Sequence, residues 1–143
     1  MLASSILKDK GADIYSVSPG DTLTDAARTL CEHKVGAAVV IDSGGQPVGV
    51  FSERDLAKAI GHTGPQALGE AVSSVMSTGL VTAGPAATVD QLMSLMTEKR
   101  VRHILIMEGN TLVGVVSIGD VVKRKIATAE AEAESLKAYI EGV

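Results

Sequence analysis

Apolar residues recur at helical spacing in two places, one in each half of the chain. Each stripe follows the i, i+3, i+4, i+7 pattern of an amphipathic helix and comes directly after a threonine that can cap the helix. The first stripe is Leu23, Ala26, Ala27 and Leu30 after Thr22, and the second is Val89, Leu92, Met93 and Met96 after Thr88. The pattern therefore predicts one helix at the same place in each half.

Each predicted helix is followed by two continuous apolar runs that a glycine-containing turn separates. The runs cover residues 37–41 and 47–51 in the first half and residues 103–107 and 112–116 in the second. Two short apolar runs around such a turn are typical of a β-hairpin. Because the runs lack alternating polar residues, we expect sheets that are covered on both faces.

The two halves also share individual residues in the same order. Pro19, Thr22 and Glu32 correspond to Pro85, Thr88 and Glu98. Self-similarity of this kind indicates an internal repeat, here with units of about 50 residues. We expect a lead-in helix at 1–13, a first repeat at 14–60, a linker with a short helix at 61–79, a second repeat at 80–126 and a helical extension at 127–143.

Apolar residues near the C-terminal end are spaced alternately four and three residues apart. They are Val122, Ile126, Ala129, Ala133, Leu136 and Ile140. This alternation is the spacing of a coiled-coil seam. We expect the seam to contact a second copy of the chain, and the alternative is that the helix folds back onto its own domain.

Composition narrows the classes of partner. The 143 residues are 45% hydrophobic but only 2% aromatic, which favours a globular aliphatic core and disfavours base stacking. A net charge of −4 argues against nucleic-acid binding. Cys31 is the only cysteine, so a disulfide within the chain and a multi-thiolate zinc site are excluded, and we expect no metal. Because Cys31 continues the first apolar stripe, we expect its thiol to be buried.

The N-terminal residues lack the pattern of a signal peptide, and no segment approaches the roughly 20 apolar residues of a membrane span. We therefore expect a cytoplasmic protein with no membrane contact.

The chemistry of the chain is concentrated in a phrase that occurs twice, at residues 49–55 and 114–120. Each copy reads glycine, two apolar residues, serine, two further residues and aspartate, where an apolar run gives way to a helix. The glycine allows another group to approach the backbone. A serine at a helix N-terminus, with the free N–H groups there, favours a phosphate, and the aspartate can accept hydrogen bonds from a ribose diol.

The alternative is a purely structural role, because Ser-x-x-Asp also caps a helix and stabilises its start by about 1 kcal/mol. Two copies in the same strand and turn context favour the ligand site. Arg54 adds a cation in the first copy, whereas Gly119 adds room in the second. We therefore expect the two sites to be unequal.

These phrases, in register with the repeat, resemble the tandem cystathionine β-synthase (CBS) domain module, and residues 52–55 look like the first-repeat form of small stand-alone bacterial members. The resemblance implies an α/β (α+β) fold, with two β-α-β-β-α CBS repeats packed about a pseudo-twofold axis and a long C-terminal helix. It implies clefts for AMP, ADP, ATP, NAD(H) or S-adenosylmethionine, and a homodimer or tetramer.

Carried over by position, the resemblance gives two sets of nucleotide-binding residues. Ser52, Arg54 and Asp55 would serve one cleft together with Thr82, Val101, Arg102 and His103 of the other repeat. Ser117, Gly119 and Asp120 would serve the second cleft together with Ser16, Val35, Gly36 and Ala37. Arg102 and His103 would also reach a phosphate in their own repeat's cleft.

The function expected from these residues is an adenine-nucleotide sensor that signals to an unknown protein target. No acid, base and nucleophile are arranged around the clefts, so we expect no enzyme activity, no catalytic residue and no catalytic cofactor. The alternative is a dimerising interaction subunit that works without a nucleotide.

Overall fold

A computed structural model describes residues 1–142, and the chain divides into two compact units. One unit is Asp13–Leu80, and the other joins Met1–Ala12 to the chain from Val81 onward. Each unit contains one repeat, but the residues that lead into the first repeat belong to the second unit. The mixed α/β class, the duplicated β-α-β-β-α order and the long C-terminal helix are all confirmed.

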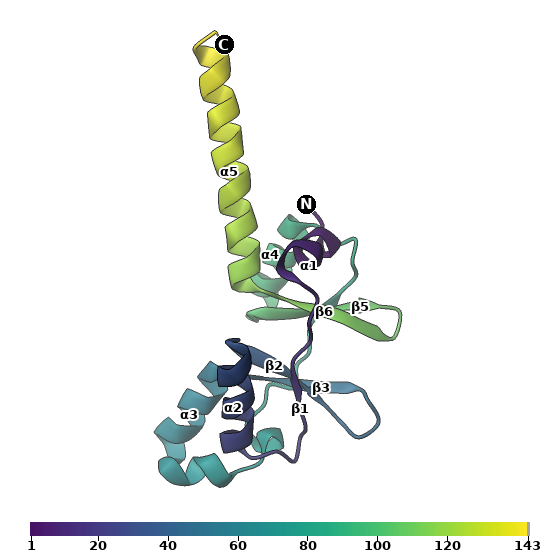
Figure 1. The fold of residues 1–143 in the computed structure, drawn as a ribbon, viewed down its shortest axis with the longest axis vertical. Coiled ribbons are helices and arrows are strands. Elements are labelled where there is room, and N and C mark those ends of the chain that lie inside the picture. Colours follow the sequence, from purple (N-terminus) through teal and green to yellow (C-terminus); the bar gives the residue numbers. More distant parts are fainter. Residues whose placement is uncertain (143) are drawn as a thin grey trace. The chain divides into compact units, whose positions relative to one another are not determined.

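The unit Asp13–Leu80 has a three-stranded sheet in the order β1-β2-β3 (Figure 1). Strands β1 and β2 are parallel, and β2 and β3 form the predicted antiparallel hairpin. The elements are β1 (Ser16–Val17), α2 (Leu23–His33), β2 (Ala37–Ile41), β3 (Pro47–Ser52), α3 (Glu53–Thr63) and the short 3-10 helices η1 (Pro65–Gly69) and η2 (Val72–Ser74).

The second unit repeats this topology with the sheet order β4-β5-β6. Its elements are α1 (Ala3–Lys10), β4 (Thr82–Ala83), α4 (Val89–Lys99), β5 (His103–Glu108), β6 (Thr111–Ser117) and α5 (Ile118–Ile140). Three consecutive residues are buried in each middle strand, Ala38–Val40 in β2 and Ile104–Ile106 in β5. Since successive strand residues point to opposite faces, both faces of these strands are covered, as predicted.

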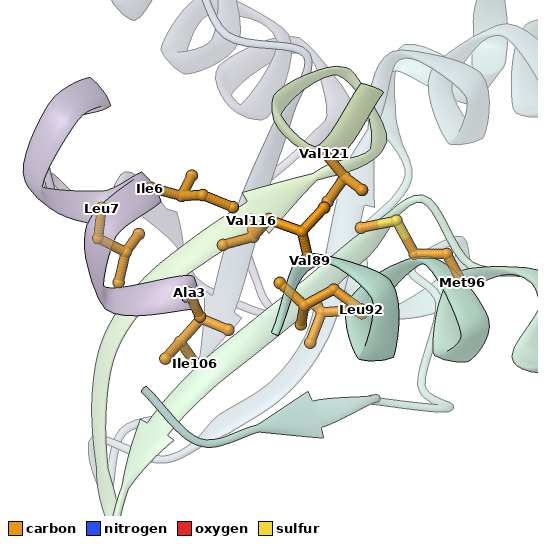
Figure 2. Close-up of a cluster of buried hydrophobic side chains, with 10 residues drawn as sticks. Ala3, Ile6, Leu7, Val89, Leu92, Met96, Ile106, Val116 and Val121 are labelled. Carbon is orange, nitrogen blue, oxygen red and sulfur yellow. The ribbon is translucent and has the colours of Figure 1, made fainter. Parts of the chain in front are cut away.

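Helix α1 completes the core of the second unit although it lies at the other end of the sequence. Figure 2 shows Ile6 of α1 beside Val116 of β6 and Ala3 beside Ile106 of β5. Leu7 of α1 and Leu92 of α4 belong to the same cluster. In the first unit, Val72 of η2 takes part in the core around Phe51 in the same way. Each short lead-in helix therefore packs on the repeat that it does not precede along the chain.

The lead-in segments pack closely against the glycines of the two phrases. A Cβ atom at Gly114 would lie 2.6 Å from both Cδ atoms of Leu7, and one at Gly49 would lie 2.6 Å from Sδ of Met76 and 3.0 Å from the carbonyl oxygen of Ser77. The group that approaches each glycine closely is thus the chain's own lead-in segment. A larger side chain at either position would displace that segment.

A left-handed residue ends α2 and α4 at equivalent positions. Lys34 has φ 55° and Arg100 has φ 54°, and after them the N–H of Val35 donates to the carbonyl of Leu30 and the N–H of Val101 to that of Met96. This pattern is typical of a Schellman-type helix end, where glycine is the usual residue. It turns the chain sharply from each helix into the middle strand of the sheet.

The expectation of a buried Cys31 is wrong. Helix α2 buries Leu23, Ala26 and Leu30, whereas Cys31 is exposed. A residue one position after Leu30 lies about 100° farther round the helix, beyond the side that faces the core. Among residues 1–142, the helices are all too short or too polar to cross a membrane.

Candidate functional site

The first of the two strand–helix junctions is built from Ser52 and Asp55. Ser52 ends β3 and caps α3, where its Oγ accepts a hydrogen bond from the backbone N–H of Asp55 at 3.3 Å. In return, Oδ2 of Asp55 accepts from the backbone N–H of Ser52 at 2.9 Å and from its hydroxyl at 3.0 Å. The pair is therefore a complete capping box, which orients both side chains.

The second junction has the same capping box with one different partner. Oγ of Ser117 accepts from the N–H of Asp120 at 3.2 Å, and Oδ2 of Asp120 accepts from the N–H of Ser117 at 2.8 Å. In addition, the ammonium of Lys10 donates to Oδ2 of Asp120 at 2.7 Å and to the carbonyl of Val115 at 2.9 Å. Lys10 is the last residue of α1, so the lead-in helix reaches this junction.

The electrostatics of the second junction follow from Lys10. Burial by itself would raise the pKa of Asp120, but the hydrogen bond from Lys10, the backbone hydrogen bond from Ser117 and the charge of Lys10 together outweigh burial and lower the pKa below its ordinary value. The side chains of Lys10 and Asp120 are 34% and 21% exposed, so the pair is open to water on one side. Asp120 is held as a carboxylate at neutral pH.

Within each unit, the predicted site residues meet at one end of the sheet. The N–H of Glu53 donates to the carbonyl of Gly36 at 3.0 Å, and Ala37 pairs with Ser52 across the hairpin. In the other unit, the N–H of Ile118 donates to the carbonyl of Arg102 at 2.8 Å, and His103 pairs with Ser117. The starts of β2 and β5 therefore lie beside the serine and aspartate of their own repeat.

The remaining predicted residues lie on the adjacent strand or on the turn into the middle strand. Ser16 of β1 pairs with Val39 of β2, and Thr82 of β4 pairs with Leu105 of β5. Val35 and Val101 come directly after the left-handed residues that end α2 and α4. Each unit thus gathers its seven predicted residues around one strand–helix junction.

Two predicted cations are available to an anion at these junctions. Arg54 and Arg102 are both exposed, and neither forms an ion pair with a carboxylate of residues 1–142. His103 is half-buried at the start of β5. Guanidinium groups that have no carboxylate partner can bind a phosphate without first breaking an internal contact.

Lys10 is the residue of this site that the sequence did not indicate. It lies 110 residues before Asp120, at the end of the lead-in helix α1. Nothing in a repeat alignment marks such a residue, and the only available signal was a basic residue near the end of the lead-in helix. The second junction therefore has a cation as well as the room provided by Gly119, where an added Cβ would meet only Oγ of Ser117, at 3.6 Å.

A hollow of about 400 Å³ opens beside the first junction. Residues of α2, α3 and the turn between α2 and β2 line it, among them Val35, Glu53 and Leu56. Its lining is mainly aliphatic, with one lysine and one glutamate at its edge. Ser52 and Asp55 are not part of the lining, so the hollow borders the junction without containing its polar groups.

Known proteins resemble the chain over both repeats. The CBS domain family model matches residues 6–62 and 72–127. A solved CBS-domain containing protein from Agrobacterium tumefaciens is 42% identical and has a TM-score of 0.83, with 87% of this chain and 92% of that chain covered. The mitochondrial CBS domain-containing protein CBSX3 of Arabidopsis thaliana is 34% identical over an alignment of 147 positions, which covers 97% of this chain and 71% of the relative.

One solved structure of a similar protein was determined with a nucleotide. It is a CBS domain protein from Pyrobaculum aerophilum complexed with AMP. The sequence identity is 25% and the TM-score is 0.74, with 84% of this chain and 89% of that chain covered.

Proposed function

Because this chain belongs to the CBS domain family and carries a tandem pair of CBS domains, we propose that it is a regulatory module that binds an adenosine-containing ligand. Binding would change the conformation or the oligomeric state of the protein and so the surface that it presents to a partner. A ligand can do this only if it binds one of the two states more tightly than the other.

The observation that supports the proposal most is the duplicated capping box, which fixes an aspartate carboxylate at each junction. In both boxes, Oδ2 of the aspartate accepts the hydrogen bonds that hold the carboxylate in place. An ionised carboxylate has acceptor sites for two neighbouring hydroxyls, as a ribose diol requires. The capping box fixes the carboxylate before the ligand arrives.

The phosphate would bind at the helix N-terminus beside this carboxylate. In α3, the first N–H, of Glu53, donates to Gly36 and the third, of Asp55, donates to Ser52. The second, of Arg54, is then the N–H that a phosphate oxygen would accept from, and Gly119 holds the same position in α5. The guanidinium of Arg54 and, in the other repeat, that of Arg102 would supply the counter-charge.

The ligands that this arrangement suits are AMP, ADP, ATP and NAD(H), which all carry a ribose diol and a phosphate on adenosine. The complex of the Pyrobaculum aerophilum relative with AMP makes AMP the first ligand to test. S-adenosylmethionine has the diol but no phosphate, so comparing it with AMP separates the contribution of the carboxylate from that of the cations.

Titration calorimetry with these five ligands tests the proposal. We expect AMP to bind, and we expect Asp55→Asn and Asp120→Asn each to remove or weaken one binding event. Asparagine keeps an oxygen for the capping hydrogen bond but loses the charge, so the fold is retained. Asp42→Asn, in the β2–β3 turn at the opposite end of the hairpin from Ser52, is the matched control. The absence of binding by every ligand would refute the proposal.

We also propose that the bound nucleotide is not turned over. Incubating the protein with each ligand and then separating the nucleotides by chromatography would reveal a product. Release of any product above the rate of a protein-free control would contradict this part of the proposal.

The exposed apolar residues of α5 favour a second candidate function, a homodimeric interaction subunit. Ile126 is 54% exposed and Leu136 is 59% exposed, and residues 125–142 are exposed throughout. On this alternative, Asp55→Asn and Asp120→Asn leave the interaction with a cytoplasmic protein target unchanged, while Leu136→Glu abolishes it. Affinity measurements on the three variants distinguish the two functions.

A further inference from the structure

Helix α5 presents an apolar seam that its own unit does not cover. Val121 is buried in the core, and Arg124 forms an ion pair with Asp9 at 2.8 Å, so the side of the helix with these residues faces the unit. Val122 and Ile126 lie on other sides and are 42% and 54% exposed. Figure 1 shows α5 continuing in green and yellow well beyond its contacts with α4 and α1.

The seam has the residue types of a two-stranded coiled coil. In heptad notation, the a positions are Ile126, Ala133 and Ile140, and the d positions are Val122, Ala129 and Leu136. Isoleucine occupies the first and last a positions and leucine the last d position, and isoleucine at a with leucine at d favours two strands over three or four. The alanines at the centre of the seam allow the two backbones to approach.

We propose that α5 pairs in parallel with α5 of a second copy of this chain. The charged residues beside the seam determine the direction. In a parallel pair, each g position faces the e position of the next heptad of the partner helix. Glu132 at g then faces Lys137 at e of the partner helix, and Lys125 at g faces Glu130 at e, so both contacts join opposite charges.

An antiparallel pair with the same overlap brings like charges together. There, e faces e and g faces g of the partner helix. Glu130 would meet Glu130 of the partner helix, Glu132 would meet Glu132, and Lys123 would meet Lys137. Since like charges in contact are destabilising, the sequence disfavours this direction.

The pair Glu132 and Lys137 carries most of the specificity. Lys125 already forms an ion pair with Asp90 of α4 at 2.8 Å, so its charge is shared. Neither Glu132 nor Lys137 forms an ion pair within residues 1–142. Both therefore remain available to a second copy.

The inference rests on the second candidate function, the homodimer, and specifies how the two copies meet; it does not depend on the ligand. Disulfide formation in the full chain tests it, with Cys31→Ser as background and oxidised glutathione as oxidant. In a parallel pair, identical d positions face each other, so Ala129→Cys is expected to form a disulfide between two copies. Ala131→Cys, at an exposed f position on the opposite side of the helix, is the matched control. We expect it to form the disulfide at about one tenth of the rate of Ala129→Cys, or at a still lower rate.

The opposite direction gives a different result. In an antiparallel pair, Ala129 faces Ala133 of the partner helix, so Ala129→Cys alone does not cross-link, but a mixture with a differently tagged Ala133→Cys variant does. That pattern overturns the proposed direction while leaving the homodimer intact. A protein that sediments as a monomer at all concentrations overturns the homodimer and the inference together.

Charge reversal supplies a second readout that does not use cysteine. Glu132→Lys places lysine opposite Lys137 of the partner helix, and we expect the dimer dissociation constant to rise about five- to tenfold. Adding Lys137→Glu restores opposite charges and is expected to recover most of the affinity. Circular dichroism of both variants checks that the helix content is unchanged. If the double variant dimerises no better than Glu132→Lys, the proposed e–g contacts are wrong.

Discussion

Replacing Lys10 with methionine tests whether the lead-in helix is held to the second junction by charge. Methionine keeps an apolar stem of similar length but removes the ammonium, which donates at 2.7 Å to Asp120 and at 2.9 Å to the carbonyl of Val115. Asp120 still accepts a hydrogen bond from the N–H of Ser117, so its carboxylate is not stranded. What is lost is one charge-assisted hydrogen bond and one hydrogen bond to a carbonyl.

The magnitude follows from the exposure of the pair. A charge-assisted hydrogen bond contributes about 1.5–3 kcal/mol when buried, and an exposed ion pair contributes about 0–1 kcal/mol. With side chains 34% and 21% exposed, solvent screening places this pair between the two limits. We expect Lys10→Met to lower the free energy of unfolding by about 1–2 kcal/mol at pH 7.

Urea denaturation as a function of pH is the assay. The folded pKa of Asp120 lies below its ordinary value of 3.8, so the contribution of the carboxylate is fully present above that value and is lost as the pH falls through the lower folded pKa. Lys10→Met raises the folded pKa of Asp120 toward the ordinary value. The difference in stability between wild type and variant should therefore shrink as the solution is acidified below about pH 4.

Lys8→Met is the matched control, because Lys8 lies on the same helix, is exposed and forms no ion pair with residues 1–142. It makes the same change in net charge and is expected to alter stability by less than about 0.5 kcal/mol. In a double-mutant cycle, Asp120→Asn should remove most of the effect of Lys10→Met. Equal effects of Lys10→Met with and without Asp120, or at pH 7 and pH 3, would refute the electrostatic account.

Three further outcomes can be measured by denaturation or thiol labelling. Gly49→Ala and Gly114→Ala should each destabilise the protein by about 1–3 kcal/mol, because the added Cβ overlaps the lead-in segments. Gly119→Ala should cause no loss of stability, and equal stabilities of the three variants would contradict this packing. Lys34→Gly should stabilise the protein by about 0.5–1 kcal/mol by relieving the left-handed conformation, and Lys34→Ala, which keeps that strain, should not. The thiol of Cys31 should react with a thiol reagent in the folded protein as readily as in urea, and full protection would show that it is buried.

Local patterns in the sequence predicted the parts of the fold that local forces determine. The predicted hairpins match β2 with β3 and β5 with β6, and the helices begin directly after Ser52 and Ser117, as the capping pattern indicates. A capping residue acts on N–H groups within three residues, so its signal is readable in one short segment. The same reasoning located both junctions of the candidate site.

Contacts between distant segments could not be predicted in this way. The ion pair of Lys10 with Asp120 joins residues 110 positions apart, and nothing in the repeated phrases marks Lys10, because the phrases contain no residue of α1. The exposure of Cys31 has a related cause. Its position on the helix differs by one residue from that of the buried Leu30, and only the finished packing shows where the covered face ends.

Each lead-in segment packs on the repeat that it does not precede, so Gly49 and Gly114 have a packing role in addition to any role in ligand binding. Met76 and Ser77, which precede β4, pack against Gly49, and Leu7, which precedes β1, packs against Gly114. A repeat excised with its own lead-in segment would therefore lack the segment that fills its core. Lys10 at the end of α1 also contacts the second capping box, so on the proposed function a ligand that hydrogen-bonds to Asp120 would compete with the contact that anchors α1. On that proposal, ligand binding at the second junction and the attachment of the lead-in helix would depend on the same carboxylate.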